Sequence, residues 1–147
     1  MILLGCNMRY LIDTNIFVYY ASDRGLLSHD VIDILYDYDT VLYMSAESVK
    51  ELIVAFRNKK LLSKRWKTER DMLRAIEDEF FIQVLPLKKE HMETYADMEL
   101  NEAQEHKDPS DHVIIAQAIT EHIPLISSDT RFPFYTKQGL ELIVNKK

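Results

Sequence analysis

The sequence predicts an α/β protein, a three-layer α/β/α sandwich with a mainly parallel central sheet. Two observations indicate this fold class. Apolar stretches of strand length alternate with stretches of helical spacing along the whole chain, and polar residues directly follow several of the expected strands. Such alternation is typical of a parallel sheet whose crossover helices cover both faces. With 147 residues, the chain is long enough for one core. We expect one domain over residues 8–147 and a short tail at residues 1–7.

The expected elements follow from the periodicity of the apolar residues. Strands are predicted at 10–12, 41–44, 80–85, 124–127 and 140–144. Helices are predicted to begin at Ile16, near His29, after Ser45, at Lys88 and at Asp108–Pro109, with one or two more in 57–76. Ser45 and Asp108 are residue types that cap helix N-termini. If the sheet is parallel, Asp13, Ser45 and Asp129 follow strands at the same edge.

Composition and charge exclude several classes of protein. A single cysteine, Cys6, excludes an internal disulfide and a cysteine-bound zinc, and a reducing cytoplasm is the expected location. No apolar run reaches the length of a membrane span. The net charge is −6, yet the segment 57–74 carries +6 and the remainder −12. This basic segment could hold a phosphate backbone near acidic residues, or it could be an ordinary solvated helix face.

Acidic residues recur where apolar strands end. Asp13 follows Leu11 and Ile12, and Asp129 follows a similar stretch through Ser127. In open α/β sheets this edge is the usual position of a ligand site. The alternative for Asp13 is that it only caps the next helix.

Two further acids are placed on helices. Glu51 and Glu47 lie one turn apart on the polar face of the helix after Ser45, and spacing does not choose between them. Asp111 is the third residue of the helix that Asp108 caps, where a capping-box role is the alternative. Carboxylates that converge in a crevice raise one another's pKa and are costly without a cation. Oxygen ligands suit Mg²⁺ or Mn²⁺, and such an ion would support hydrolysis of a phosphodiester.

These residues occur in motifs that resemble the PIN domains, in particular the VapC-like toxin ribonucleases. The resemblance covers Met8 to the C-terminus. Its motifs are Leu11-Ile12-Asp13-Thr14-Asn15, then Ser45, Ser48, Glu51 and Leu52, then Asp108-Pro109-Ser110-Asp111 with residues 114–118, and last Leu125-Ile126-Ser127-Ser128-Asp129 with Phe132. His112 stands where related chains often carry Arg, and Ser127 where Thr is frequent.

The resemblance implies an Mg²⁺- or Mn²⁺-dependent endoribonuclease, the toxin of a type II toxin–antitoxin pair. It selects Glu51 over Glu47, so that Asp13, Glu51, Asp111 and Asp129 are the expected metal-binding and catalytic residues. Thr14, Asn15 and Ser127 are expected to orient ligands, substrate or water. The implied partners are RNA, a VapB-like antitoxin and a second copy of the chain in a homodimer. The basic segment could guide RNA or receive the antitoxin.

Two other functions remain as alternatives. A non-catalytic PIN-like scaffold would bind RNA or protein only. An aspartyl phosphatase would use Asp13 as nucleophile, but it needs a second Asp two residues on, where this chain has Asn15. The histidines show no metal-ligand spacing and are expected at the surface or at helix ends; they are His29, His91, His106, His112 and His122.

Overall fold

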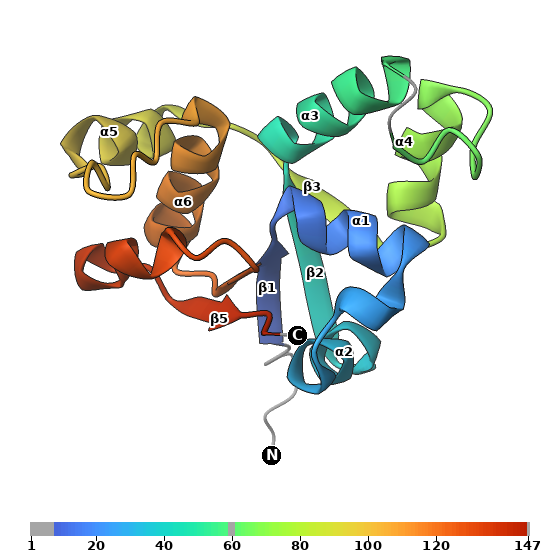
Figure 1. Ribbon diagram of the computed structural model, residues 1–147, viewed down its shortest axis with the longest axis horizontal. Coiled ribbons are helices and arrows are strands. Elements are labelled where there is room, and N and C mark those ends of the chain that lie inside the picture. The colour runs from blue at the N-terminus through green and yellow to red at the C-terminus, as the bar shows by residue number, and fades with distance from the viewer. Residues whose placement is uncertain (1–7, 59–60, 147) are drawn as a thin grey trace.

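The computed structural model describes residues 8–58 and 61–146 as an α/β sandwich around one five-stranded sheet (Figure 1). The expected tail at residues 1–7 lies outside the described residues. The strand order is β3-β2-β1-β4-β5, and every neighbouring pair is parallel. The strands are β1 (Met8–Ile12), β2 (Thr40–Ser45), β3 (Ile82–Leu85), β4 (Leu125–Ser127) and β5 (Leu142–Val144). The predicted fold class is therefore confirmed.

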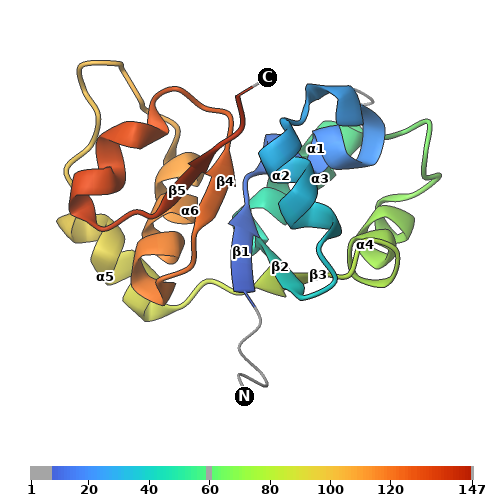
Figure 2. The same ribbon diagram turned by 90° about the horizontal axis from the view of Figure 1, so that it is seen from below.

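Helices cover both faces of this sheet (Figure 2). One face carries α1 (Thr14–Ser22), α2 (His29–Tyr36), α3 (Ala46–Arg57) and α4 (Glu69–Asp78). The other carries α6 (Pro109–Glu121) and the 3-10 helix η2 (Phe132–Gln138), with α5 (Lys89–Asp97) packed against α6. A short 3-10 turn, η1 (Arg24–Leu26), links α1 to α2.

Alternation along the strands divides the apolar residues between two cores. Leu11 belongs to the core under α6, whereas its neighbour Ile12 belongs to the core under α1–α4. Leu125 and Ile126 of β4 divide in the same way. This is the side-chain period of two that a strand imposes, and it buries the adjacent apolar residues of β1 and β4 on opposite faces of the sheet.

Several predicted bounds differ from those observed by one or two residues; for example, α1 begins at Thr14 rather than at Ile16, and β5 at Leu142 rather than at residue 140. The third strand begins at Ile82 rather than at residue 80, because Phe81 has a positive φ of 54° and breaks the extended conformation. The basic segment contains the end of α3, an irregular stretch and, among its described residues, one further helix, α4, in agreement with the one or two helices predicted there. Leu61, Leu62 and Trp66 of that stretch pack against the protein's own core.

No helix within the described residues is long and apolar enough to cross a membrane.

Candidate functional site

The site lies at the carboxyl edge of the sheet, where β1, β2 and β4 end side by side. The register pairs Ile12 with Met44 on one side and with Ile126 on the other. The residues that follow, Asp13, Ser45 and Ser127, are therefore neighbours across the sheet, as the sequence predicted. Parallel pairing produces this alignment without any special loop.

Asp13 is both a helix cap and a member of the site. It is the N-cap of α1, and its Oδ1 accepts a hydrogen bond of 2.8 Å from the N–H of Thr14. Its Oδ2 accepts a hydrogen bond of 2.8 Å from Ser127 Oγ. The side chain is buried at 6% exposure. Burial, with a contribution from the charge of Asp111 and Glu51, raises the pKa of Asp13 to about 7.

Asp129 is joined to Asp13 through Ser127. Ser127 Oγ accepts a 3.1 Å hydrogen bond from the N–H of Asp129 while donating to Asp13. The carboxylate of Asp129 is held by Arg131, through Nε to Oδ1 at 3.0 Å and through a terminal nitrogen to Oδ2 at 2.8 Å. Burial alone would raise the pKa of Asp129, but the hydrogen bonds from Arg131 outweigh it and lower that pKa.

Glu51 reaches the site through Thr14. Thr14 Oγ1 donates to Glu51 Oε1 at 2.7 Å and lies 2.8 Å from Ser48 Oγ. Burial raises the pKa of Glu51. Glu47 instead forms an ion pair of 3.0 Å with Lys50. Of the two acids on this helix, Glu51 is thus the one linked to the residue beside Asp13.

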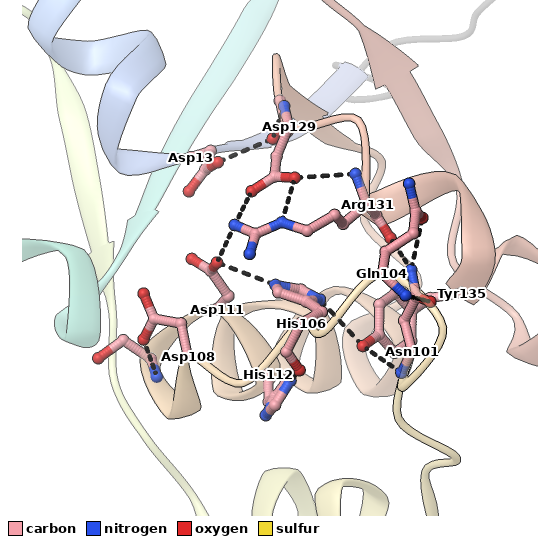
Figure 3. Close-up of polar contacts among 12 residues, drawn as sticks. Asp13, Asn101, Gln104, His106, Asp108, Asp111, His112, Asp129, Arg131 and Tyr135 are labelled. Atoms are coloured by element: carbon pink, nitrogen blue, oxygen red, sulfur yellow. Dashed lines mark hydrogen bonds and ion pairs between the residues drawn. The ribbon is translucent and has the colours of Figure 1, made fainter.

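Asp111 points into the same region from α6 (Figure 3). Asp108 caps that helix by accepting from the N–H of Ser110 at 2.9 Å. The capping-box alternative does not describe Asp111, because its Oδ2 lies 3.0 Å from His106 Nε2 and 3.8 Å from the guanidinium of Arg131. Burial, then the charges of Asp108, Asp129 and Glu51, raise the pKa of Asp111 to about 7.

Of the three residues predicted to orient ligands or substrate, two are hydrogen-bonded to the predicted acids. Thr14 and Ser127 bridge the carboxylates as described above. Asn15 is exposed on the first turn of α1.

The prediction that the histidines lie at the surface or at helix ends is wrong for His106, which is buried in the loop before α6, whereas His91 and His112 lie in the first turns of α5 and α6. His91, His106 and His112 are buried, at 0%, 2% and 2% exposure. His106, Asp111 and Asp129 each offer a possible ligand atom, and these atoms lie within 4.8 Å of one another. His106 and Arg131 are the functional candidates that the sequence analysis missed. A histidine two residues before a helix cap gives no sequence signal of burial, because the Tyr135 that contacts its Nδ1 is 29 positions away.

Among the described residues, the group of three whose possible ligand atoms lie within 4.8 Å of one another contains Asp111 and Asp129 of the predicted acids, but not Asp13 or Glu51. The chemistry of the four predicted acids suits a hard divalent cation. The acids expected to bind it supply only oxygen atoms, and burial beside like charges gives Asp13 and Asp111 a pKa near neutrality. A bound cation would relieve that repulsion and restore both carboxylates to their charged form.

A parallel α/β fold with acidic residues at the carboxyl edge of its sheet places those acids where open α/β proteins bind their ligands. The family model of the PIN domain matches residues 10–137, and the chain belongs to this family. No curated protein matches the sequence significantly.

Solved structures share the fold at low identity. The chain is similar to one in the crystal structure of VapBC2 from Rickettsia felis bound to a promoter DNA fragment, with a TM-score of 0.71 and 18% identity over 95% of this chain and 100% of that chain. It is also similar to one in VapBC-1 from nontypeable Haemophilus influenzae, with a TM-score of 0.65 and 22% identity over 93% and 98%. A third match is DNA-bound VapBC from Salmonella typhimurium, with a TM-score of 0.66 and 16% identity over 93% and 98%.

Proposed function

We propose that this PIN domain is an Mg²⁺- or Mn²⁺-dependent endoribonuclease and the toxin of a type II toxin–antitoxin pair. The observation that carries the proposal is that the buried Asp13 and the partly buried Asp111 lie close enough to affect each other's charge, with the pKa of both raised to about 7. Burial and like charges make two ionised carboxylates in one place costly, and strongly shifted pKa values are typical of functional sites. The VapBC complexes with the same fold support the toxin assignment.

The residues that would hold the cation are Asp13, Glu51, Asp111 and Asp129. When bound, a divalent ion polarises the phosphate and lowers the pKa of the attacking water. The chain's own polar residues prepare this site. Ser127 fixes one oxygen of Asp13, and Thr14 fixes one oxygen of Glu51. The second oxygen of Asp13 accepts the N–H of Thr14, so the remaining lone pairs of these carboxylates would hold the ion. One of the carboxylates would accept the proton of the attacking water.

The proposed partners are RNA, a VapB-like antitoxin and a second copy of the chain, in the cytoplasm. The exposed basic residues of segment 57–74 suit a phosphate backbone. Some of them are engaged within the fold, since Arg57 pairs with Glu69 at 2.9 Å and Arg65 stacks on Trp66. The apolar residues that could receive an antitoxin are partly covered by the core, so we assign the segment to RNA.

The alternatives are a scaffold without catalysis and an aspartyl phosphatase. A scaffold has no use for buried acids that raise one another's pKa. A phosphatase needs a general acid at position 15, which is an exposed Asn.

The test is Asp13→Asn, because Asn is also a good helix cap and should keep α1 intact. We expect the variant to fold and to lose cleavage of total RNA and of synthetic oligoribonucleotides in Mg²⁺. Asp33→Asn, at an exposed position on α2, is the matched control and should cleave like the wild type. Cleavage by Asp13→Asn at the wild-type rate would overturn the site assignment. A wild-type protein whose melting temperature does not change with Mn²⁺ would favour the scaffold.

A further inference from the structure

His106 is a buried residue of the site with a hydrogen-bond partner on each side of its ring (Figure 3). Its Nδ1 lies 3.0 Å from the hydroxyl of Tyr135, and its Nε2 lies 3.0 Å from Oδ2 of Asp111. The imidazole thus connects the core under η2 to a carboxylate of the proposed metal site.

The hydrogen bonds of the Tyr135 hydroxyl determine which nitrogen of the His106 ring carries the proton. The Tyr135 hydroxyl accepts the N–H of Asn101 at 3.1 Å and is fully buried. Its own proton needs an acceptor, and among the residues that the structure describes His106 Nδ1 is the one within reach. Nδ1 is therefore unprotonated and Nε2 carries the proton. Since Nε2 is a donor, its hydrogen bond goes to Asp111.

The backbone of His106 is held as firmly as its ring. His112 Nε2 donates to the carbonyl of His106 at 2.8 Å, and the N–H of His106 donates to the carbonyl of Asn101 at 3.0 Å. Asn101 is buried, and its Nδ2 donates to the carbonyl of Arg131 at 3.0 Å. The loop before α6 is thereby attached to both halves of the site, so the position of Nε2 is defined by the core.

We propose that His106 is a positioning residue that donates from Nε2 to Asp111 Oδ2 and thereby turns the other oxygen, Oδ1, toward the cation. This inference rests on the proposed function. It assigns His106 a role beside the ion rather than on it. Coordination through Nε2 would require that atom to lose its proton. Nδ1 would then carry the proton, and the buried Tyr135 hydroxyl would lose its acceptor.

A second buried pair in the same protein provides a matched control. His91 Nδ1 accepts the N–H of Lys88 at 3.0 Å, and His91 Nε2 lies 2.7 Å from Oε2 of Glu121. This pair joins α5 to the opposite end of α6 and has the same tautomer. It has the same structural role as His106 without contact to the predicted metal ligands.

The experiment compares two conservative variants at each histidine. In His106→Gln the amide nitrogen reaches the place of Nε2 and keeps a donor for Asp111. In His106→Asn the shorter amide reaches only the place of Nδ1. We expect His106→Asn to weaken Mn²⁺ binding, measured by calorimetry, by about 10- to 100-fold. His106→Gln should stay near the wild type, and His91→Gln and His91→Asn should leave the Mn²⁺ affinity unchanged.

Equal Mn²⁺ affinity of His106→Asn, His106→Gln and the wild type would overturn the inference alone. A wild type that binds no Mn²⁺ would overturn the proposed function as well, so the two failures are distinguishable. If His106→Asn does not fold, ¹⁵N NMR of the wild-type imidazoles decides. We expect His106 to show the Nε2–H tautomer with and without Mg²⁺, and loss of that proton on adding Mg²⁺ would overturn the positioning role.

Discussion

A buried histidine contacts a carboxylate of helix α6 at each end of that helix, but the surroundings of the two contacts differ. At each end a buried histidine presents Nε2 to a carboxylate, His106 to Asp111 and His91 to Glu121. The carboxylates are ten positions apart on one helix, or roughly 15 Å along its axis. Asp111 lies among other acids, which help to raise its pKa to about 7. Glu121 is a half-exposed partner that links α6 to α5.

This difference shows that a buried histidine–carboxylate pair does not by itself indicate a functional site. Both pairs satisfy buried polar groups, and both hold helices in place. Asp111 differs from Glu121 because other acidic side chains lie near it at the carboxyl edge of the sheet, and their charges raise its pKa. The functional inference therefore rests on the convergence of acids and not on the histidine.

The comparison with the largest expected effect removes the carboxylate charge at one end of α6 and then at the other, and measures RNA cleavage in each variant. We expect Asp111→Asn to lower the rate of RNA cleavage by on the order of 10³-fold or more, because a lost ligand removes several kcal/mol of charge stabilisation. Glu121→Gln keeps an acceptor for His91 and should cleave at the wild-type rate. Single-turnover cleavage assays in saturating Mg²⁺ measure both. An Asp111→Asn variant that cleaves normally would remove the functional distinction between the two ends.

The next effect is on stability without metal, and its sign depends on pH. The pKa of Asp111 is about 7 in the folded state against a model value of 3.8. Between these values the folded protein binds the extra proton, so the contribution of Asp111 to stability falls as pH rises from about 4 to 7 and is constant above. The Asp111→Asn side chain does not ionise, so the variant does not lose this stability as the pH rises. In EDTA we expect it to melt at least about 3 °C above the wild type at pH 8, with a smaller gain at pH 5.

Glu121→Gln, melted under the same conditions, is the control for that pH dependence and should show no gain that grows with pH. Each variant's melting temperature must be compared with that of the wild type at the same pH, because the wild type also contains His106 and His112. Burial lowers the pKa of both histidines. These histidines change the free energy of unfolding with pH in the opposite direction to Asp111, because their contribution to stability is lost when the pH falls. An Asp111→Asn gain that is equal at pH 5 and pH 8 would contradict the raised pKa.

The sheet and the acids could be predicted because their signals are local. Each strand is a short apolar run, and Asp13, Glu51, Asp111 and Asp129 belong to motifs of adjacent or helix-spaced residues. The burial of the two histidines could not be predicted, since His106 contacts Tyr135 across 29 positions and His91 contacts Glu121 across 30, even though Asp111 is only five positions from His106. From sequence alone, a single histidine among polar residues is predicted to be exposed, because the residue that it contacts in the folded protein is not apparent. The early start assigned to β3 failed for a local reason, the positive φ of Phe81.

The smallest effect tests whether the C-terminal end of α6 is free of functional constraint. His122 caps the helix in the left-handed conformation, with φ of 54° and ψ of 43°. Glycine adopts this conformation without the cost that a Cβ adds, although it also gains freedom in the unfolded chain. We expect His122→Gly to raise the free energy of unfolding by about 0.5 kcal/mol, which is roughly 1–2 °C in melting temperature. His122→Ala keeps the Cβ and should gain nothing, so an equal gain in both variants would refute the backbone explanation. RNA cleavage and Mn²⁺ affinity should be unchanged in both, because the end of α6 that positions Asp111 is held by its own contacts to His106 and Asp108.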